Sequence, residues 1–277
     1  MKISGSVGYT LLQKRTLGAT HDKFVLLLSD IHDGVTYCEQ DAVMIDNYLS
    51  LQDHNNVLLE EVLRENLTLT DLWPGSQHTQ RLKQLNIKNK NIKPVDVRPM
   101  LLPFSWELIK MNKINQNITL QKYLILLDNF FNYKNTHFNN HYVVSEIKKP
   151  FDRKDLIITH FHIIKDKYNK FKLKHKQLME HTIMDIYMNN NNVLESLNSI
   201  ASLIMEWYII ILIHTSNKNT IIHVGLAHSE KILTLLTNVY QHIIIQSQGI
   251  NRLENLHGTM NACIVVPPDI HNLFNHK

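Results

Sequence analysis

The sequence contains very little cysteine. Only Cys38 and Cys263 occur among its 277 residues, and neither lies in the close spacing with a second cysteine that zinc sites require. Two cysteines exclude a framework of several disulfides and are typical of a reducing compartment, although one bridge between them remains open. We therefore predict a cytoplasmic location.

The chain also lacks a strong excess of either charge. Its formal net charge is +4, and its basic residues are scattered along the sequence. The densest group, residues 165–176, also contains Asp166 and has helical spacing. This pattern predicts a solvated helix face and not a nucleic-acid patch, so we expect no nucleic-acid partner.

No stretch is both long and apolar enough to predict a membrane span. The opening MKISGSVGYT lacks the apolar centre of a signal peptide. Residues 201–214 form the most apolar run, but Glu206 interrupts it, and crossing a bilayer takes about 20 residues. We predict that this run is a buried helix, with Glu206 at its boundary or paired.

The chain does have the apolar content of a globular core. Hydrophobic residues make up 44% of it, and its length suits one large α/β domain or two small ones. Residues 9–15 and 23–29 predict an N-terminal hairpin. Short apolar strands then alternate with predicted helices up to residue 98. This strand–helix alternation predicts a mostly parallel central sheet of an α/β fold.

Strand patterns almost vanish between residues 104 and 219, where helical spacing dominates. They return at residues 220–224 and 242–245, with a helix predicted between them at 230–240. The tail at 264–268 predicts an edge strand or an extended docking arm. We therefore predict one α/β domain of residues 1–277 that carries a helical insertion over residues 104–219.

A polar loop follows the apolar strand predicted at residues 24–28. The loop reads Ser-Asp-Ile-His-Asp-Gly and places Asp30, His32 and Asp33 close together. Ligands and catalytic groups of parallel sheets gather beyond the carboxyl ends of strands, which makes this loop a candidate site. The alternative is that an aspartate caps the next helix and His32 is a surface residue.

Three further predicted strands also end in polar side chains. The four groups are Asp30 with His32 and Asp33, Glu60 with Glu61, Asp96 with Arg98, and His223 with His228. We predict that one pocket is lined by Asp30, His32, Glu60 or Glu61, Arg98 and His228. Strand alternation sends only one of the two glutamates to that pocket, and we expect the other to be solvated. His223, inside a strand, is expected to be structural.

Two kinds of chemistry suit these residues. Imidazoles and carboxylates can hold a divalent metal such as zinc, manganese or cobalt, with His32, Glu60 and His228 as ligands. The same groups can run metal-free acid–base hydrolysis through His32, Glu60, Glu61 and His228. In either case we expect Asp30 and Arg98 to contact the substrate.

The segments LLLSDIHDG, VLLEE and IIHVGLAHSEKILTLL resemble the clan of TraB/PrgY proteins, Tiki metalloproteases, erythromycin esterases and ChaN-like haem-binding proteins. The resemblance covers about half of the chain. It implies an α/β core with a hydrolase-like site, in which His32, one of Glu60 and Glu61, and His228 take the conserved polar positions. Asp30 stands where the esterase-like branch has a glutamate. Ser29 replaces the clan's first glycine, and the chain shows no arginine-bearing helix of the TraB type.

Two alternatives accompany the hydrolase prediction. This clan includes proteins that are not enzymes, so an inactive relative that binds a protein or a cofactor is one alternative. The other is a calcineurin-like metallophosphoesterase, because SDIHDG resembles the first of that family's four motifs; the other three are not found. The chain also resembles a protein group of large DNA viruses. This resemblance implies that the protein acts in the cytoplasm of the host cell, and that its partner is a substrate or a host protein.

Overall fold

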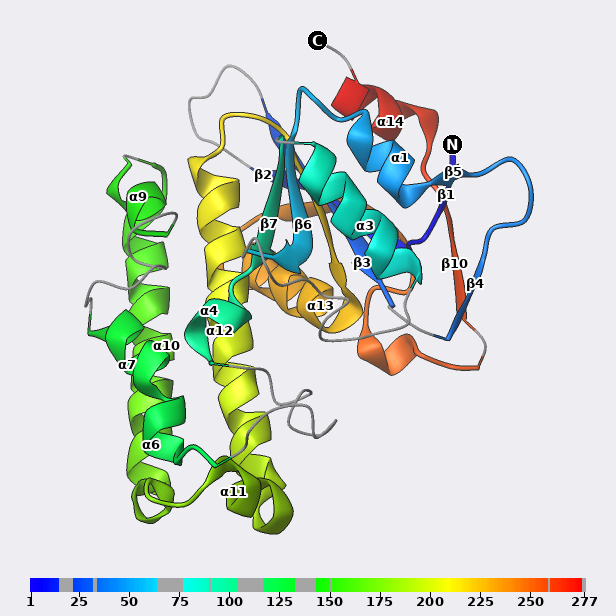
Figure 1. Cartoon of the computed structure of the whole chain (residues 1–277). Coiled ribbons are helices and arrows are strands. Elements are labelled where there is room, and N and C mark those ends of the chain that lie inside the picture. Colours follow the sequence, from blue (N-terminus) through cyan, green and yellow to red (C-terminus); the bar gives the residue numbers. More distant parts are fainter. Residues whose placement is uncertain are drawn as a thin grey trace. The chain divides into compact units, whose positions relative to one another are not determined.

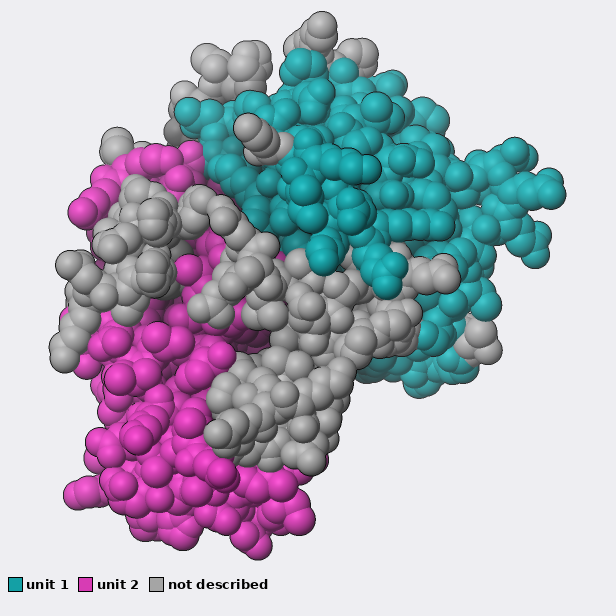
Figure 2. Space-filling view, in the orientation of Figure 1, with its two compact units in different colours: residues 1–61, 73–95, 216–277 teal, residues 62–72, 96–215 magenta. Residues whose placement is uncertain are grey.

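The computed structural model describes residues 1–14, 22–31, 34–63, 77–89, 91–103, 117–132, 143–149, 151–258 and 260–275. The chain divides into two compact units (Figure 2). The first comprises residues 1–61, 73–95 and 216–277, and the second comprises residues 62–72 and 96–215. The α/β class is confirmed, with mostly parallel sheets and a long helical region. Whether the two units form one domain stays a prediction.

A six-stranded sheet is the centre of the first unit (Figure 1). Its strand order is β7-β6-β8-β3-β2-β9. The strands are β2 (Gly8–Lys14), β3 (Lys23–Asp30), β6 (Asn56–Val62), β7 (Ile92–Asp96), β8 (Thr220–Gly225) and β9 (Ile243–Gly249). β8 runs parallel to both β3 and β6, whereas β2 is antiparallel to β3 and β9. The predicted hairpin and the parallel centre are therefore both present.

A second, smaller sheet has the order β4-β10-β1-β5. Its strands are β1 (Lys2–Ser4), β4 (Val35–Tyr37), β5 (Val43–Met44) and β10 (Met260–Val265). The sequence did not predict this sheet, because strands of two or three residues are too short to show a period. The predicted edge strand in the tail is instead an internal strand, since β10 lies between β4 and β1.

Helices of the first unit pack against the six-stranded sheet. They are α1 (Ile45–Ser50), α3 (Gln77–Lys88), α13 (Leu226–Thr234) with its π-helical continuation (Leu235–Val239) and α14 (Pro268–Asn275). A 3-10 turn (Leu253–Asn255) contacts α13. Alternate strand residues such as Leu28, Leu59 and Ile221 form one buried cluster with side chains of α1, α3 and α14. α13 contacts β3 and β8. It begins before residue 230, so the predicted start of that helix was wrong.

Every element of the second unit is helical among the residues that the structure describes. The helices are α4 (Arg98–Leu101), α6 (Leu120–Tyr123), α7 (Ile125–Phe131), α9 (Val143–Lys148), α10 (Lys154–Lys174), a 3-10 turn (Lys176–Leu178), α11 (Ile183–Asn189) and α12 (Asn191–Thr215). The long helices α10 and α12 pack together, and the Trp207 indole donates a hydrogen bond to the Ile157 carbonyl at 2.9 Å. The aromatic rings of Phe130 and Phe161 meet edge-on beside that indole.

Helix α12 contains the apolar run of residues 201–214, which was predicted to be a buried helix. Among the described helices it alone has the length and apolar composition to cross a membrane, but 78% of its most apolar window is buried inside the protein. Such burial is typical of a core helix. Glu206 is fully buried in α12, and its charge acts on His160 of α10. His160 is half-buried.

Candidate functional site

The best-defined polar contact at the carboxyl edge of the six-stranded sheet involves Glu60. Its side chain is 3% exposed, and its Oε2 accepts a hydrogen bond of 2.6 Å from the backbone N–H of Gly225. Gly225 ends β8 and is the N-cap of α13. The first N–H groups of a helix lack partners within the helix and carry partial positive charge, so a carboxylate there is stabilised.

His228 faces the other oxygen of the same carboxylate. Its Nε2 lies 3.5 Å from Glu60 Oε1, and its side chain is 11% exposed. This separation is longer than a good N–H···O hydrogen bond, which measures about 2.7–3.2 Å. Because α13 begins at Leu226, His228 lies in the first helical turn and not in a loop before the helix. The structure therefore brings together Glu60 and His228, two of the predicted site residues.

Glu61 points the opposite way. β6 continues to Val62, so both glutamates are strand residues and their side chains alternate between the faces of the sheet. Glu61 shares the face of Leu59, which belongs to the cluster formed with α1, α3 and α14. Glu61 is 1% exposed. The expectation that one glutamate would be solvated is therefore wrong, because the strand carries both into buried surroundings.

Asp30 and His223 lie on the face of Glu61. Asp30 ends β3 opposite Gly225, and it is buried. His223 aligns with Leu28 and Leu59, and its Nε2 lies 3.3 Å from the carbonyl oxygen of Gly5. That contact inside the core supports the structural role expected for His223. Strand alternation thus divides the candidate residues into Glu60 with His228 on one face, and Asp30, Glu61 and His223 on the other.

Two serines beside the Glu60–His228 pair were not predicted as site residues. The hydroxyls of Ser29 on β3 and Ser229 on α13 are 2.7 Å apart, and both are buried. They fasten the first turn of α13 to the sheet. Gly8 pairs with Ser29, and a Cβ atom on Gly8 would collide with the backbone of Ile250. The replacement of the clan's glycine by Ser29 was the one sequence signal for this contact.

Arg98 forms a bidentate ion pair in the second unit. Its Nε lies 2.8 Å from Asp96 Oδ1 and its Nη2 lies 2.8 Å from Asp96 Oδ2, while its backbone N–H also bonds Oδ1. Asp96 is fully buried. Parallel contacts of this kind hold a guanidinium in one orientation. One edge of the Arg98 guanidinium thus binds Asp96, and the predicted role of Arg98 towards a substrate stays a prediction.

His32 and Asp33 lie outside the described residues, so the roles predicted for them stay predictions. Within the part of the chain that the structure describes, no three His, Cys, Asp or Glu side chains gather as a metal ion would require. Glu60 and His228 supply two potential ligands. The predicted metal site, with His32 as a third ligand, therefore stays a prediction.

Comparison with known proteins gives no assignment: no protein-family model, no curated protein and no solved structure matches the chain.

Proposed function

We propose that this protein is a hydrolase of the TraB/Tiki/erythromycin-esterase type, with Glu60 and His228 at its centre. The observation that carries the proposal is the arrangement of Glu60: one oxygen binds the amino end of α13, and the other faces an imidazole from the same helix turn. A carboxylate that orients an imidazole is the usual partner of a general base.

In the metal-free form of the proposal, His228 takes a proton from the attacking water. Glu60 positions the ring and stabilises the imidazolium that forms. Because Glu60 already occupies the Gly225 N–H, that donor is not offered to an oxyanion of the substrate. The negative charge of the transition state then needs a partner other than the Gly225 N–H.

In the metal-dependent form, Glu60 and His228 would be two ligands of the ion and His32 the third. His228 Nε2 and Glu60 Oε1 lie 3.5 Å apart, near enough for both to contact one ion. The ions that suit this set are zinc, manganese or cobalt. A bound ion would supply a water of lowered pKa as the nucleophile.

Purified protein tests both forms. Hydrolysis of a panel of aryl esters and peptides is measured beside the metal content of the same preparation. His228→Ala should lower activity by about a hundredfold or more, the usual scale for losing a general base. His257→Ala, which changes an exposed histidine of the same unit, should leave activity unchanged and serves as the matched control. If the wild-type protein contains bound metal and the His228→Ala variant does not, the metal-dependent form of the proposal is supported.

A binding module is the second candidate, and the low exposure of the pair favours it. Glu60 is 3% and His228 is 11% exposed, which leaves a substrate little access to either. A wild-type protein without hydrolysis across the panel and without bound metal would support this candidate against the hydrolase. We further propose a cytoplasmic location for either function.

A further inference from the structure

The segment that links the two sheets of the first unit has little burial of its own. None of the described residues from Ile31 to Met44 is buried. In β4, Val35 is half-buried, while Thr36 and Tyr37 are exposed. Segments that lack buried apolar side chains open at low free-energy cost. Only Val43 of this segment packs against the core, and Val43 and Met44 pair with β1, so most of residues 34–44 depend on other contacts.

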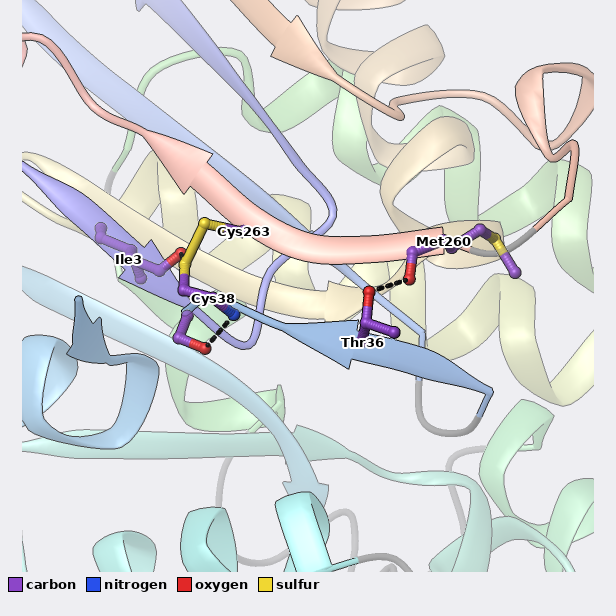
Figure 3. The surroundings of a disulfide bond; sticks show 6 residues. Ile3, Thr36, Cys38, Met260 and Cys263 are labelled. Atoms are coloured by element: carbon purple, nitrogen blue, oxygen red, sulfur yellow. Dashed lines mark hydrogen bonds between the residues drawn. A yellow bond between two sulfur atoms is a disulfide. The ribbon is translucent and has the colours of Figure 1, made fainter. Parts of the chain in front are cut away.

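Backbone pairing and one covalent bond hold this segment (Figure 3). β4 pairs in parallel with β10 over three positions, and the Thr36 hydroxyl donates to the Met260 carbonyl at 3.2 Å. The Cys38 N–H donates to Ser4 Oγ at 3.1 Å. Directly after β4, Cys38 is joined to Cys263 of β10 by a disulfide, with the two Cα atoms 4.9 Å apart. This bridge is the pairing that the sequence left open.

The two cysteines differ in how firmly their own strands are anchored. Cys263 lies between Ala262 and Ile264, both buried, and β10 is antiparallel to β1 as well as parallel to β4. Cys38 has no buried described neighbour on either side along the chain up to Ile45. If the bond opens, β10 has its core contacts to keep it in place, whereas residues 34–44 keep the pairing of β4 with β10, the pairing of β5 with β1 and the partly buried Val43.

The bond is also open to chemical attack. Both cysteines are half-buried, so a thiolate from solution can approach a sulfur atom. The sequence contains no third cysteine, so the pair cannot rearrange to another partner within the chain. Within the chain, the pair can therefore form only this one disulfide.

We propose that Cys38–Cys263 is a redox-sensitive clasp that controls the order of residues 34–44. A dithiol reductant opens it: one thiolate attacks a cysteine sulfur to form a mixed disulfide, and the other cysteine leaves as a thiolate. The second thiol of the reductant then displaces the first cysteine, so the reductant ends as a disulfide. The protein gains two electrons and two protons.

Opening the clasp releases β4 from β10 while the six-stranded sheet stays folded. β4 follows the last residue of β3, Asp30, after four residues, so its release loosens the chain that leaves the carboxyl edge of the sheet. In a reducing cytosol the clasp would be open, and in an oxidising compartment it would be closed. This proposal does not depend on the hydrolase function.

Amide hydrogen exchange tests it on the full chain. The exchange rates of peptides covering residues 34–44 are compared with those of β6 peptides, first oxidised, then in a dithiol buffer, then re-oxidised. Reduction should raise exchange in residues 34–44 by about tenfold or more and leave β6 unchanged, and re-oxidation should reverse the effect. The double variant Cys38→Ser/Cys263→Ser should exchange like the reduced protein and ignore the reductant.

Three results would overturn the proposal. Unchanged exchange in residues 34–44 after confirmed reduction would show that the pairing alone holds them. A parallel rise in β6 would show that the bond is a staple of the whole unit and not a local clasp. If the disulfide stays oxidised in a dithiol buffer set to the reduction potential of the cytosol, the Cys38–Cys263 bond is not a redox switch.

Discussion

Each unit of the molecule contains a buried glutamate that interacts with a histidine. The two glutamate–histidine pairs differ in their surroundings. In the first unit, Glu60 is hydrogen-bonded to the start of α13 and faces His228. In the second unit, Glu206 lies fully buried in α12 and its charge acts on His160 of α10. The first carboxylate is held by backbone at a strand end, where sites form; the second lies within packed helices.

The comparison teaches that a pair of residue types does not define a site. A carboxylate at a helix amino end is stabilised as an anion, and its orientation is fixed by the backbone. A carboxylate buried between helices loses hydration and gains mainly Coulomb energy from its neighbours. We therefore propose a functional role for Glu60 and His228 and a structural role for Glu206 and His160. The following predictions test that distinction.

Replacing Glu206 alone with leucine should destabilise the protein. Removing one member of a buried charged pair costs about 3–5 kcal/mol, because the groups that interact with it are left buried and uncompensated. Urea unfolding of Glu206→Leu measures the effect. A loss of less than about 1 kcal/mol would show that the Glu206 carboxylate contributes little to the helical unit.

The matching change at Glu60 should destabilise the protein less. Glu60→Leu removes the acceptor of the Gly225 N–H, and a buried donor without its partner costs about 1–3 kcal/mol. The same urea titration checks this, with Glu254→Leu as the control because Glu254 is highly exposed. If both glutamates respond alike to leucine, the distinction between the two pairs fails.

The smallest effect concerns the pH dependence of stability through His160. Burial lowers the pKa of His160, the charge of Glu206 raises it in part, and Lys167 adds to the lowering. The unfolded chain, with the ordinary pKa of 6.5, therefore binds the proton first as the pH falls. The free energy of unfolding should decrease as the pH falls below about 6.5, until His160 is protonated in the folded protein too.

His160→Asn should weaken this acid dependence. The free energy of unfolding is measured at about pH 7.5 and about pH 5.5 in the wild type and the variant. His162→Asn, on the exposed side of the same helix, is the control and should leave the difference unchanged. An acid dependence that His160→Asn does not reduce would contradict the buried environment of this histidine.

Continuous apolar runs made much of the fold predictable. The runs ending at Leu28, Leu59 and Val224 each become a central strand, because burial on both faces requires apolar residues at every position. The small sheet could not be predicted, since its strands depend on pairing between the two ends of the chain. The disulfide joins residues 225 positions apart, a distance over which sequence spacing carries no information.

The candidate site was predictable in part. Strand ends placed Glu60 and His228 in one region, because parallel strands end at one edge of a sheet. The choice between Glu60 and Glu61 depended on where β6 ends, and the strand continues past both. The Gly225 N–H contact could not be foreseen, because Leu-Ala-His-Ser reads as a turn and not as the start of a helix. The influence of Glu206 on His160 depends on the packing of α10 against α12, which no local pattern encodes.

One measurement tests the central claim most directly: hydrolytic activity of four variants in one assay, with metal content determined alongside. Glu60→Gln and His228→Ala should each lose about a hundredfold or more, as expected for a general base and its orienting carboxylate. Glu206→Gln and His160→Ala, which alter the pair of the helical unit, should stay within about threefold of the wild type while remaining folded. Equal losses in both pairs, or full activity in His228→Ala, would contradict the assignment of Glu60 and His228 as the functional pair.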